Sequence, residues 1–565
     1  MSGPVKVDVL VVGSGAAGLS AAVTAAMHGA SVMVAEKASV LGGTSAWSGG
    51  WLWIPHNPLA RAEGIDEAAD APLTYLQHEM GGEAADIRLQ TFLRYGPEMV
   101  EFFHQRTVVQ FLSGSAMPDF HPSPGAANGG RSVTAQPYDG RLLGDWLHRL
   151  RPPLETISLG GMGIAGGADM AHFFNATRSP RSALYAARRL LRHGWQRLRA
   201  GRGQHLVNGN ALVARLLRSA LDAGVRFQLN APVVRLLQGP PGVSGAVLRS
   251  DSGEIHVEAG AVVLACGGFP HDRQRLAQVV PHAAEGYGHF SAAPPDNQGE
   301  GIRLGESVGG QFDTSLRHPL AWAPVSRVTL ASGQQLMFPH LVERAKPGVI
   351  AVLPNGKRFV NEADSYHDFI AALLAATPAG DTPQAWLLAD RRTLRRYGLG
   401  HARPFPFTPT AWLRTGYLQR GNTLAELAKQ CAIDANALAE TVERFNHFAS
   451  TGEDVDFHRG ASAYNRAQGD HQVTLGPLRE GPFYAVRILP GSLGTFSGLQ
   501  TDEHARVLDE QQQPIPGLYA IGNDMSSVMR GYYPSGGITL GPAMTFGYLV
   551  GKNLAKKTNI NNSIA

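Results

Sequence analysis

The chain has 565 residues, more than one compact domain usually contains, so two or three structural units are expected. Its hydrophobic share of 44% and charged share of 17% are typical of a globular protein with a large core. The net charge of +4 is too small to indicate nucleic-acid binding. The two cysteines, Cys266 and Cys431, are far apart and form no CxxC motif, which argues against a disulfide scaffold, a zinc site or an iron–sulfur cluster, so no metal is expected.

Membrane and export signals are absent from the printed sequence. No apolar run reaches the ~18 residues of a spanning helix, and the first residues enter an apolar strand without a basic region and cleavage site. We therefore expect a cytoplasmic protein. Between Met170 and Leu221, however, arginines alternate with apolar residues at helical spacing and no acidic residue occurs. Such a basic amphipathic segment (178–218) can make a weak contact with an anionic membrane surface, and the simpler interpretation is a solvated helix.

The expected elements begin with a βαβ unit. Residues 7–12 (VDVLVV) form the β-branched apolar run of a strand buried on both faces. A glycine turn, an alanine-rich helix from about Leu19 to His28 and a second strand from Ser31 to Glu36 follow. Residues of about 60–200 are mostly helical in pattern, interrupted by a Pro/Gly-rich stretch at 118–130.

The second half of the chain departs from the βαβ pattern of the first residues and then returns to it near the end. Strands are expected near 245–248 and 261–264. Residues of about 300–485 combine Pro-rich loops with two helical stretches, 364–376 and 423–450. Residues 517–524 predict a strand that ends in a glycine turn, and 542–555 predict a closing helix.

The first glycine turn carries a dinucleotide-binding pattern. It sits between the first strand and the first helix, and an acid closes the second strand about 20 residues later. Such a turn lets the backbone approach a pyrophosphate, which the free N–H groups and positive dipole end of the helix then stabilise. The acid can bind a ribose diol. The residues are Gly13, Ser14, Gly15, Ala16, Ala17, Gly18, Glu36 and Lys37.

Further glycine-rich segments resemble the flavin-contact segments of the fumarate reductase and 3-ketosteroid dehydrogenase superfamily. They lie at 41–50, 265–269, 517–524 and 541–544. The resemblance implies FAD as the cofactor. No histidine occurs between Gly42 and Gly50, where covalent members attach FAD, so non-covalent FAD is expected. The implied contacts are Gly43, Thr44, Ser45, Gly49, Gly50, Val233, Ala265, Gly267, Gly522, Asn523, Asp524, Gly537, Thr539 and Leu540.

These observations predict an α/β fold with a discontinuous domain. A Rossmann-like FAD-binding domain is expected from residues 1–300 and 486–565, with a helical excursion at about 60–200. Residues 301–485 are expected to form an inserted α+β catalytic or cap domain. In this family the last helix begins under the flavin, where its N-terminus stabilises negative charge on the reduced ring.

The run Gly356-Lys357-Arg358-Phe359-Val360-Asn361-Glu362, with Tyr366 after it, bears on the subclass. Fumarate reductases carry the same run and place a proton-donating arginine at the position of Tyr366. The 3-ketosteroid dehydrogenases have a tyrosine there, which removes the proton next to the ketone. The resemblance therefore gives Tyr366 the role of base, and the alternative is an aromatic residue that only packs in its helix.

The run from Arg530 to Met544 supports the same subclass. Fumarate reductases keep a carboxylate-binding arginine at the position of Pro534, whereas Tyr533, Pro534 and Gly537 match the 3-ketosteroid Δ1-dehydrogenases. The resemblance implies that the Tyr533 hydroxyl and the Gly537 N–H bind the substrate carbonyl, while the flavin takes hydride from the neighbouring carbon. Tyr533 as a core residue remains open, and Arg530 is either a structural arginine or a carboxylate ligand.

Two departures leave the regiochemistry open. Where Δ1-enzymes have a tyrosine that supports the base, this chain has Phe120 followed by His121, which is the candidate replacement. Ser535 resembles the Δ4-(5α)-dehydrogenases as much as the Δ1-enzymes. The leading hypothesis is an FAD-dependent 3-ketosteroid dehydrogenase (Δ1) with a small hydrophobic cyclic ketone as substrate and an external acceptor, a quinone or similar. The alternatives are a Δ4-(5α)-dehydrogenase, a desaturase of a non-steroid cyclic ketone, a fumarate- or urocanate-type reductase, and a flavin-binding protein with a sensing or structural role.

Overall fold

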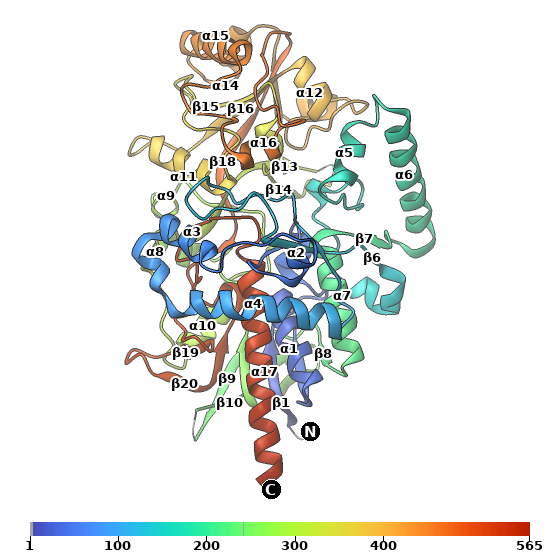
Figure 1. Cartoon of the computed structure of the whole chain (residues 1–565), viewed down its shortest axis with the longest axis vertical. Coiled ribbons are helices and arrows are strands. Elements are labelled where there is room, and N and C mark those ends of the chain that lie inside the picture. Colours follow the sequence, from blue (N-terminus) through green and yellow to red (C-terminus); the bar gives the residue numbers. More distant parts are fainter. Residues whose placement is uncertain (1–3, 241, 331, 565) are drawn as a thin grey trace.

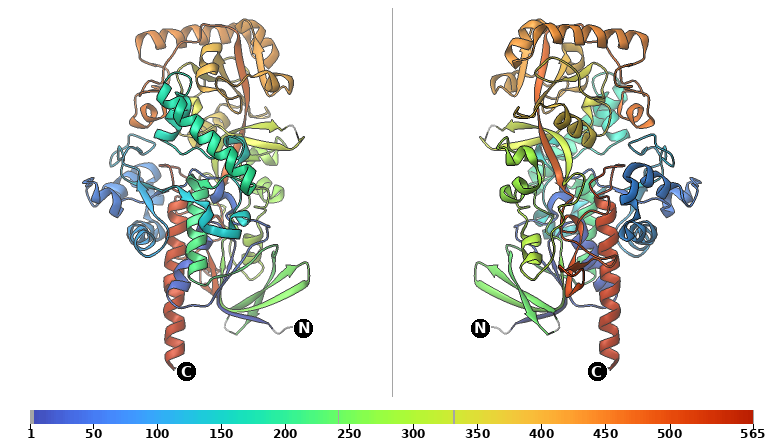
Figure 2. Two further views of the ribbon diagram at one scale, coloured as in Figure 1. Left: turned by 90° about the vertical axis from the view of Figure 1, so that its right-hand side faces the viewer. Right: turned by 90° about the vertical axis from the view of Figure 1, so that its left-hand side faces the viewer.

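The computed structural model describes residues 4–240, 242–330 and 332–564 (Figures 1 and 2). Its first sheet has a parallel centre, in which β1 (Val5–Val12) lies between β2 (Val32–Ala35) and β11 (Gly253–Leu264). β8 (Arg226–Gln228) extends this sheet beyond β2, and β20 (Pro514–Ala520) extends it beyond β11. Both faces of the second half of the central strand are covered, which explains the apolar run at residues 9–12.

Two helices from opposite chain ends pack together beside this sheet (Figure 1). α1 (Ala16–Met27) follows β1, and α17 (Leu540–Ile564) closes the chain. Their close approach depends on Gly547 and Gly551, where an added Cβ would lie 2.6 and 2.7 Å from the carbonyl oxygens of Ala17 and Ala21. The two chain ends therefore build one structural unit.

An antiparallel hairpin and an edge strand complete the first sheet. β10 (Gly242–Ser250) pairs with β11 and with β9 (Val233–Gly239), and β19 (Arg506–Leu508) pairs with β20. Helices of this half of the molecule include α7 (Asn208–Asp222), α8 (Arg273–Val279), α9 (Pro281–Ala284) and α10 (Glu300–Glu306).

The second sheet is organised around the long strand β18 (Phe483–Thr495). It pairs antiparallel with β13 (Leu320–Thr329), β16 (Ala385–Asp390) and β17 (Leu418–Gly421), and parallel with β12 (Phe290–Ser291). β14 (Gln335–Pro339) and β15 (Val349–Val352) form its edges. The helices of this region are α11 (Tyr366–Ala376), α12 (Arg391–Tyr397), α13 (Thr410–Arg414), α14 (Leu424–Cys431), α15 (Ala435–Thr451) and α16 (Ala463–Gln468).

The predicted domain boundary after residue 485 falls inside β18, whose pairing continues to Thr495. The strand pairing therefore favours a boundary after Thr495, and the division into two domains stays a prediction. The predicted helix 423–450 is two helices, because Ala432 adopts a left-handed φ of 52° and Asp434 caps the second helix.

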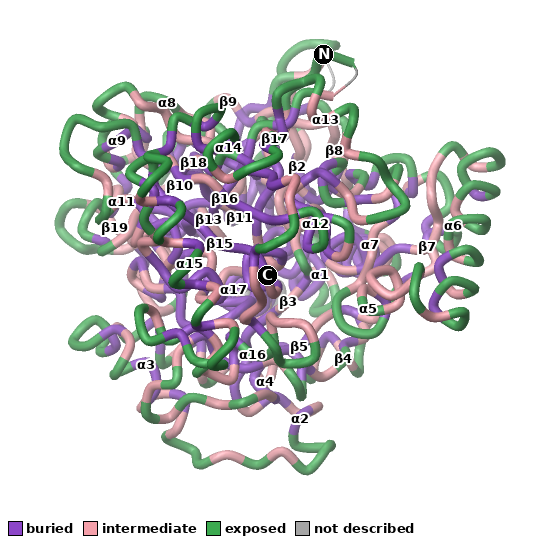
Figure 3. Tube along the Cα trace, turned by 90° about the horizontal axis from the view of Figure 1, so that it is seen from above, coloured by how far each residue is buried: buried purple, intermediate pink, exposed green. Residues whose placement is uncertain are grey.

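The excursion between the first strands and α7 is mainly helical, as the pattern indicated. It contains α2 (Pro58–Ala62), α3 (Ala71–Met80), α4 (Ile87–Arg106), α5 (Ala168–Phe174) and α6 (Pro180–Ala200), with short strands β3 (Trp51–Trp53), β4 (Phe111–Ser113), β5 (Ser132–Ala135), β6 (Tyr138–Asp139) and β7 (His205–Leu206). α6 lies at the edge of the molecule in two views (Figures 1 and 3). Among the helices of the described ranges, none combines the length and apolarity needed to span a bilayer.

Candidate active site

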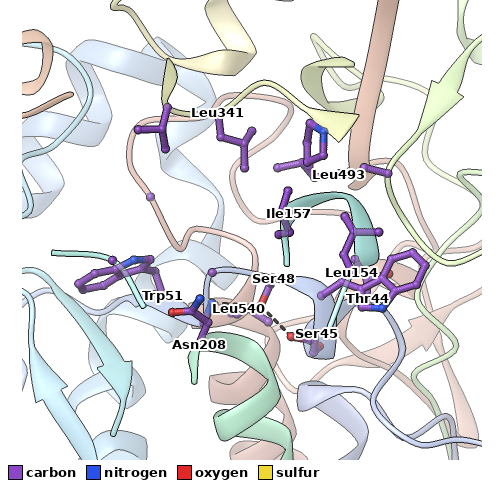
Figure 4. Close-up of a pocket in the computed structure, with 18 of the residues that line it drawn as sticks. Thr44, Ser45, Ser48, Trp51, Leu154, Ile157, Asn208, Leu341, Leu493 and Leu540 are labelled. Atoms are coloured by element: carbon purple, nitrogen blue, oxygen red, sulfur yellow. Dashed lines mark hydrogen bonds between the residues drawn. The ribbon is translucent and has the colours of Figure 1, made fainter. Parts of the chain in front are cut away.

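A cavity of about 1320 Å³ is lined by residues of both sheets and of the helical excursion. Figure 4 shows part of it, with Ser45, Ser48 and Asn208 across from the apolar side chains of Ile157 and Leu341. One part of the wall is made of glycine-rich backbone and the other of apolar side chains. The cavity can therefore take a polar, extended ligand at one end and an apolar one at the other.

The glycine-rich wall begins at the turn between β1 and α1. Gly13 has a φ of 107°, and an added Cβ would lie 2.2 Å from the carbonyl oxygen of Ala265, so only glycine fits. The N–H of Gly15 has no hydrogen-bond partner among the described residues and lines the cavity at the N-terminus of α1. A free N–H at a helix N-terminus suits a phosphate group.

The acid after β2 is held against this turn. Glu36 lines the cavity and accepts hydrogen bonds from the Ser14 hydroxyl at 2.6 Å and the Ser14 N–H at 3.1 Å. The Ser45 hydroxyl accepts a hydrogen bond from the N–H of Ala16 at 3.0 Å, which joins the second glycine segment to the first. The donor set and the uncovered glycine backbone fit the pyrophosphate and ribose of FAD.

Most of the predicted cofactor contacts line this one cavity, although they come from seven separate segments. They are Gly13, Ser14, Gly15, Ala16, Ala17, Glu36, Lys37, Gly43, Thr44, Ser45, Gly49, Gly50, Val233, Ala265, Gly267, Gly522, Asn523, Gly537, Thr539 and Leu540.

Two predicted cofactor residues lie behind the lining. An added Cβ on Gly18 would lie 2.1 Å from the carbonyl oxygen of Gly13, so this glycine lets α1 pack on β1. Asp524 is fully buried and accepts hydrogen bonds from the N–H groups of Cys266 at 2.6 Å and Gly268 at 3.0 Å. It fixes the backbone next to the cavity.

Two tyrosines meet at the far end of the glycine-rich wall. Tyr366 is the first residue of α11, and its hydroxyl donates a hydrogen bond to the Tyr533 hydroxyl at 2.7 Å. Burial raises the pKa of Tyr366 well above its ordinary value, and burial raises that of Tyr533 to about 12. Ser365 caps α11, so the positive end of the helix dipole lies at Tyr366. Both side chains line the cavity as neutral phenols.

The turn after Tyr533 presents a backbone donor. Gly537 has a φ of 104°, and its N–H has no hydrogen-bond partner among the described residues. Its carbonyl oxygen accepts a hydrogen bond from Trp53 at 3.1 Å, which fixes the turn against β3. A free N–H and a phenol hydroxyl on one wall form the donor pair that a carbonyl oxygen needs.

The segment with Phe120 holds this turn in place. The Phe120 ring stacks on the Tyr533 ring with centroids 5.8 Å apart, and its N–H donates to the Pro534 carbonyl at 3.0 Å. Asp119 is buried and bound by Trp53 at 2.8 Å and Arg131 at 2.7 Å. Phe120 is therefore a packing support for the tyrosine pair at the cavity wall.

His121 does not reach the cavity lining. Its Nδ1 lies 2.5 Å from a Glu79 oxygen and its Nε2 lies 2.8 Å from an Asp368 oxygen. These two carboxylates raise the pKa of His121 to about 10 against the opposing effect of burial. Because both ring nitrogens are engaged, His121 joins α3 to α11 and is not placed to supply the missing hydroxyl.

Tyr464 was missed by the sequence reasoning. It lies in α16, lines the cavity and packs on Phe120 with ring centroids 4.4 Å apart. Its hydroxyl has no hydrogen-bond partner among the described residues, and burial raises its pKa. No motif surrounds it, and the Asn361–Asn465 contact at 2.9 Å that fixes α16 joins segments about a hundred residues apart.

The R-F-V-N-E run has a structural role and lies outside the cavity lining. Glu362 is fully buried, 2.7 Å from Arg358 and 3.0 Å from Arg459, and these cations help lower its pKa to about 2 although burial alone would raise it. Arg530 lies outside the cavity lining, with ion pairs to Asp313 at 2.6 Å and Glu83 at 2.9 Å. That geometry supports the structural interpretation of Arg530.

A parallel sheet with a glycine turn at a helix N-terminus, opening into a cavity that ends at a phenol pair, defines an FAD-dependent oxidoreductase. The family model described as FAD binding domain matches residues 8–540, so the chain belongs to this family. The predicted fold class, family and cofactor are thereby confirmed.

Two curated relatives align over nearly the whole chain. The 4-oxocyclohex-2-ene-1-carboxylate 5-dehydrogenase of Sinomonas cyclohexanicum is 39% identical over 97% of this chain and 94% of its own. The 3-oxosteroid 1-dehydrogenase of Mycolicibacterium smegmatis is 35% identical over 97% of both chains.

A solved structure gives the same result. The 3-ketosteroid Δ1-dehydrogenase of Sterolibacterium denitrificans, in complex with 1,4-androstadiene-3,17-dione, has a TM-score of 0.88 and 36% identity over 98% of this chain and all of that chain.

Proposed function

We propose that this protein introduces a C=C bond next to the carbonyl of a cyclic ketone, with a 3-ketosteroid (Δ1) as the leading substrate. The observation that carries the proposal is the Tyr366–Tyr533 hydroxyl pair at 2.7 Å, beside the free N–H of Gly537. All three relatives named above are, by name, dehydrogenases of cyclic ketones. The Δ4-(5α) regiochemistry and a non-steroid cyclic ketone remain the alternatives.

FAD is held by the glycine-rich wall, through Gly15 and the N-terminus of α1 for the pyrophosphate and Glu36 for the ribose. We propose that the attachment is non-covalent, since no histidine occurs between Gly42 and Gly50. When bound, FAD supplies the hydride acceptor. The electrons then leave to an external acceptor, which we propose to be a quinone or a similar molecule.

The two tyrosines act on different parts of the substrate. The Tyr533 hydroxyl and the Gly537 N–H bind the carbonyl oxygen and stabilise the negative charge that develops there, which acidifies the neighbouring C–H. Tyr366 accepts that proton. Its raised pKa means that it rests as a phenol, so it acts only after losing its proton; the N-terminus of α11 favours the phenolate.

The same geometry disfavours the fumarate-type alternative. A dicarboxylate requires cations, and tyrosine and proline stand at positions 366 and 534, where the reductases have arginines. Arg530 is occupied by Asp313 and Glu83. No arginine is therefore available at the tyrosine pair among the described residues that line the cavity there.

We also propose that α6 makes a weak contact with an anionic membrane surface. Leu184, Leu191, Trp195 and Leu198 share one helical face and are 73%, 76%, 54% and 89% exposed. Arg181, Arg188, Arg192 and Arg199 are exposed beside them. An apolar stripe flanked by arginines suits the boundary between lipid headgroups and acyl chains.

Dehydrogenation is tested by a screen of the holoenzyme with steroid and monocyclic ketones, an artificial electron acceptor and mass spectrometry of the products. We expect a product lighter by two hydrogens with an alkene next to the carbonyl. Reduction of fumarate by a reduced dye, with no ketone dehydrogenated, would reject the proposal. The position of the new alkene separates Δ1 from Δ4 chemistry.

A further inference from the structure

Two cations occupy the apolar part of the cavity wall, away from the glycine-rich segments. Arg403 lines the cavity in the loop after α12, and Lys346 lines it in the segment before β15. Around them the wall is mostly apolar, with Leu154, Ile157, Phe173, Phe174, Phe338 and Leu341. Cationic side chains without an ion pair are unexpected in a chamber that receives only a neutral cyclic ketone.

Arg403 has no acidic partner among the described residues. Its Nη2 donates hydrogen bonds to the carbonyls of Thr156 at 3.0 Å and Ser158 at 2.7 Å, while Nε and Nη1 make none to described residues. Burial lowers the pKa of Arg403, and no carboxylate offsets it. Capping two carbonyls with one nitrogen therefore leaves most of the guanidinium's donors free.

Lys346 lies 8% exposed and also lacks an ion pair among the described residues. Its Nζ donates to the carbonyls of Gln468 and Gly469, both at 2.7 Å, which leaves a third N–H. Burial lowers its pKa to about 8, so it is mainly cationic at neutral pH. Glu343 and Asp470 raise its pKa slightly through space, but they form ion pairs with other groups, His340 and Arg396 respectively.

The remaining cations of the cavity wall are neutralised. Arg151 pairs with Asp296 at 2.5 Å, and Lys37 pairs with Glu300 at 2.5 Å. Arg403 and Lys346 are therefore the Arg and Lys residues of the described cavity lining that form no ion pair. A partly desolvated guanidinium with free donors is stabilised by a carboxylate, which it binds through charge-assisted hydrogen bonds.

We propose that the physiological substrate is a cyclic oxo acid, whose carboxylate binds Arg403, with Lys346 adding positive charge, while its ketone binds Tyr533 and Gly537. This inference rests on the ketone dehydrogenation proposed above. The two contacts fix both ends of the molecule, so the acid group selects the substrate and its orientation. A monocyclic oxo acid and a 3-ketosteroid with a side-chain carboxylate share this chemistry and differ in length.

The test compares matched acids and neutral analogues on the holoenzyme. The short pair is 4-oxocyclohexanecarboxylate and its carboxamide, and the long pair is a 3-ketosteroid side-chain acid and its methyl ester. KM and kcat are measured for each, together with the dissociation constant from the ligand-induced flavin spectrum. We expect one acid to bind at least tenfold more tightly than its neutral analogue, and the pair that shows this identifies the substrate length.

Arg403→Gln removes the charge and keeps an amide donor on a shorter side chain. It should raise KM and the dissociation constant for the acid about tenfold to hundredfold, the range of a charge-assisted hydrogen bond, with the neutral analogue unchanged. Arg403→Lys should restore part of the acid preference. The control is Arg414→Gln, which removes an exposed charge outside the lining and should change neither ligand.

Equal binding of acid and neutral analogue by the wild type, or an equal loss of both in Arg403→Gln, overturns the inference. In that case continued turnover of the neutral ketones leaves the dehydrogenase proposal intact. Conversely, tight acid binding that depends on Arg403 without any dehydrogenation keeps the acid site and rejects the proposed reaction.

Discussion

Tyr366 and Tyr533 are the residues that act in the proposed reaction, and their surroundings indicate different roles for them. Tyr366 begins α11, where the helix dipole favours an anion, whereas Tyr533 lies on a turn beside the free N–H of Gly537. In the hydrogen bond between them Tyr366 is the donor, which leaves the Tyr533 hydroxyl proton available for the substrate oxygen. A base and an oxyanion donor are thus kept within one hydrogen bond of each other.

Tyr366→Phe should abolish dehydrogenation while leaving ketone binding nearly unchanged, because only the proton acceptor is removed. In a stopped-flow half-reaction the flavin should stay oxidised after ketone is added, although the ketone still perturbs its spectrum. Flavin reduction at the wild-type rate would place the base elsewhere. Tyr464→Phe is the matched comparison, since it removes a neighbouring hydroxyl that lines the cavity and has no proposed role in proton transfer.

Tyr533→Phe should lower kcat/KM by roughly 10²-fold or more, the scale of losing one oxyanion donor. The variant should fold and bind FAD normally, because the Phe120 stacking contact is kept. Steady-state kinetics with the best ketone and the flavin absorbance of the purified protein check both parts. Near-normal turnover would remove Tyr533 from the carbonyl site.

At the scale of single residues, the sequence predicted the site residues that lie in or next to a family motif. Tyr366, Tyr533 and Gly537 were found because each stands next to a family pattern, and the structure brings them to one cavity. His121 was chosen by adjacency to Phe120, but its side chain turns toward Glu79 and Asp368. Tyr464 was invisible because only tertiary packing places α16 against Phe120.

Among the elements, α3 and α11 are joined by a charged bridge through His121. Glu79 belongs to α3 and Asp368 to α11, and together they hold the imidazole in its cationic form. The bridge lies just behind the helix end that carries Tyr366. The stabilising effect of this bridge depends on pH, because the pKa of the histidine is higher in the folded state than in the unfolded state. The effect is fully present at pH values below the unfolded-state pKa and is lost as the pH rises through the folded-state pKa.

His121→Gln should lower the Tm most at pH 6 and less as pH rises from about 6.5 toward 10, where the wild-type histidine loses its proton. Thermal unfolding of both proteins across this range measures the difference. A constant Tm difference at all pH values would contradict a charged His121.

Element boundaries were predictable where local signals coincide. The β-branched run and glycine turn placed β1 and α1, with α1 beginning three residues earlier than expected because the chain turns helical directly after Gly15. The break at Ala432 has no glycine or proline to mark it. β18 crosses the predicted domain boundary because its pairing partners are separated from it by long stretches of chain.

At the scale of the molecule, segments from the first and last parts of the chain and from the inserted region line one cavity. After residue 486 the sequence returns to the pattern of strand, glycine turn and helix seen near its start. This return predicted that both parts of the chain contribute to the cofactor domain. The sequence could not predict that α5 and α6 would reach the cavity through Met170, Phe173, Ala186 and Leu190, because no local pattern specifies which helices face a ligand.

The flavin should leave the polypeptide when the protein is denatured. The second glycine segment supplies hydroxyl and backbone groups, and no histidine, between Gly42 and Gly50. Acid precipitation of the yellow protein should therefore leave intact FAD in the supernatant, identified by chromatography. Flavin that remains in the precipitate would contradict non-covalent attachment.

The helix α6 gives the last prediction, because its two faces have different surroundings. Ala186 and Gln196 are 5% and 4% exposed, whereas Leu191 and Trp195 are 76% and 54% exposed on the opposite face. We expect the protein to sediment with vesicles that contain anionic phosphatidylglycerol and to remain in solution with neutral phosphatidylcholine. Salt should weaken the binding, since the flanking arginines contribute through a screened attraction.

A double variant, Leu191→Glu with Trp195→Glu, should lose vesicle binding with little change in Tm, since both side chains are exposed in the folded protein. The matched control is Leu142→Glu, which adds a charge at a leucine 61% exposed outside α6 and should bind vesicles like the wild type. Wild-type protein that stays in solution with anionic vesicles at low salt would show that the exposed face of α6 is a solvated surface. Equal loss in the control would show that net charge, and not the apolar stripe, determines the contact.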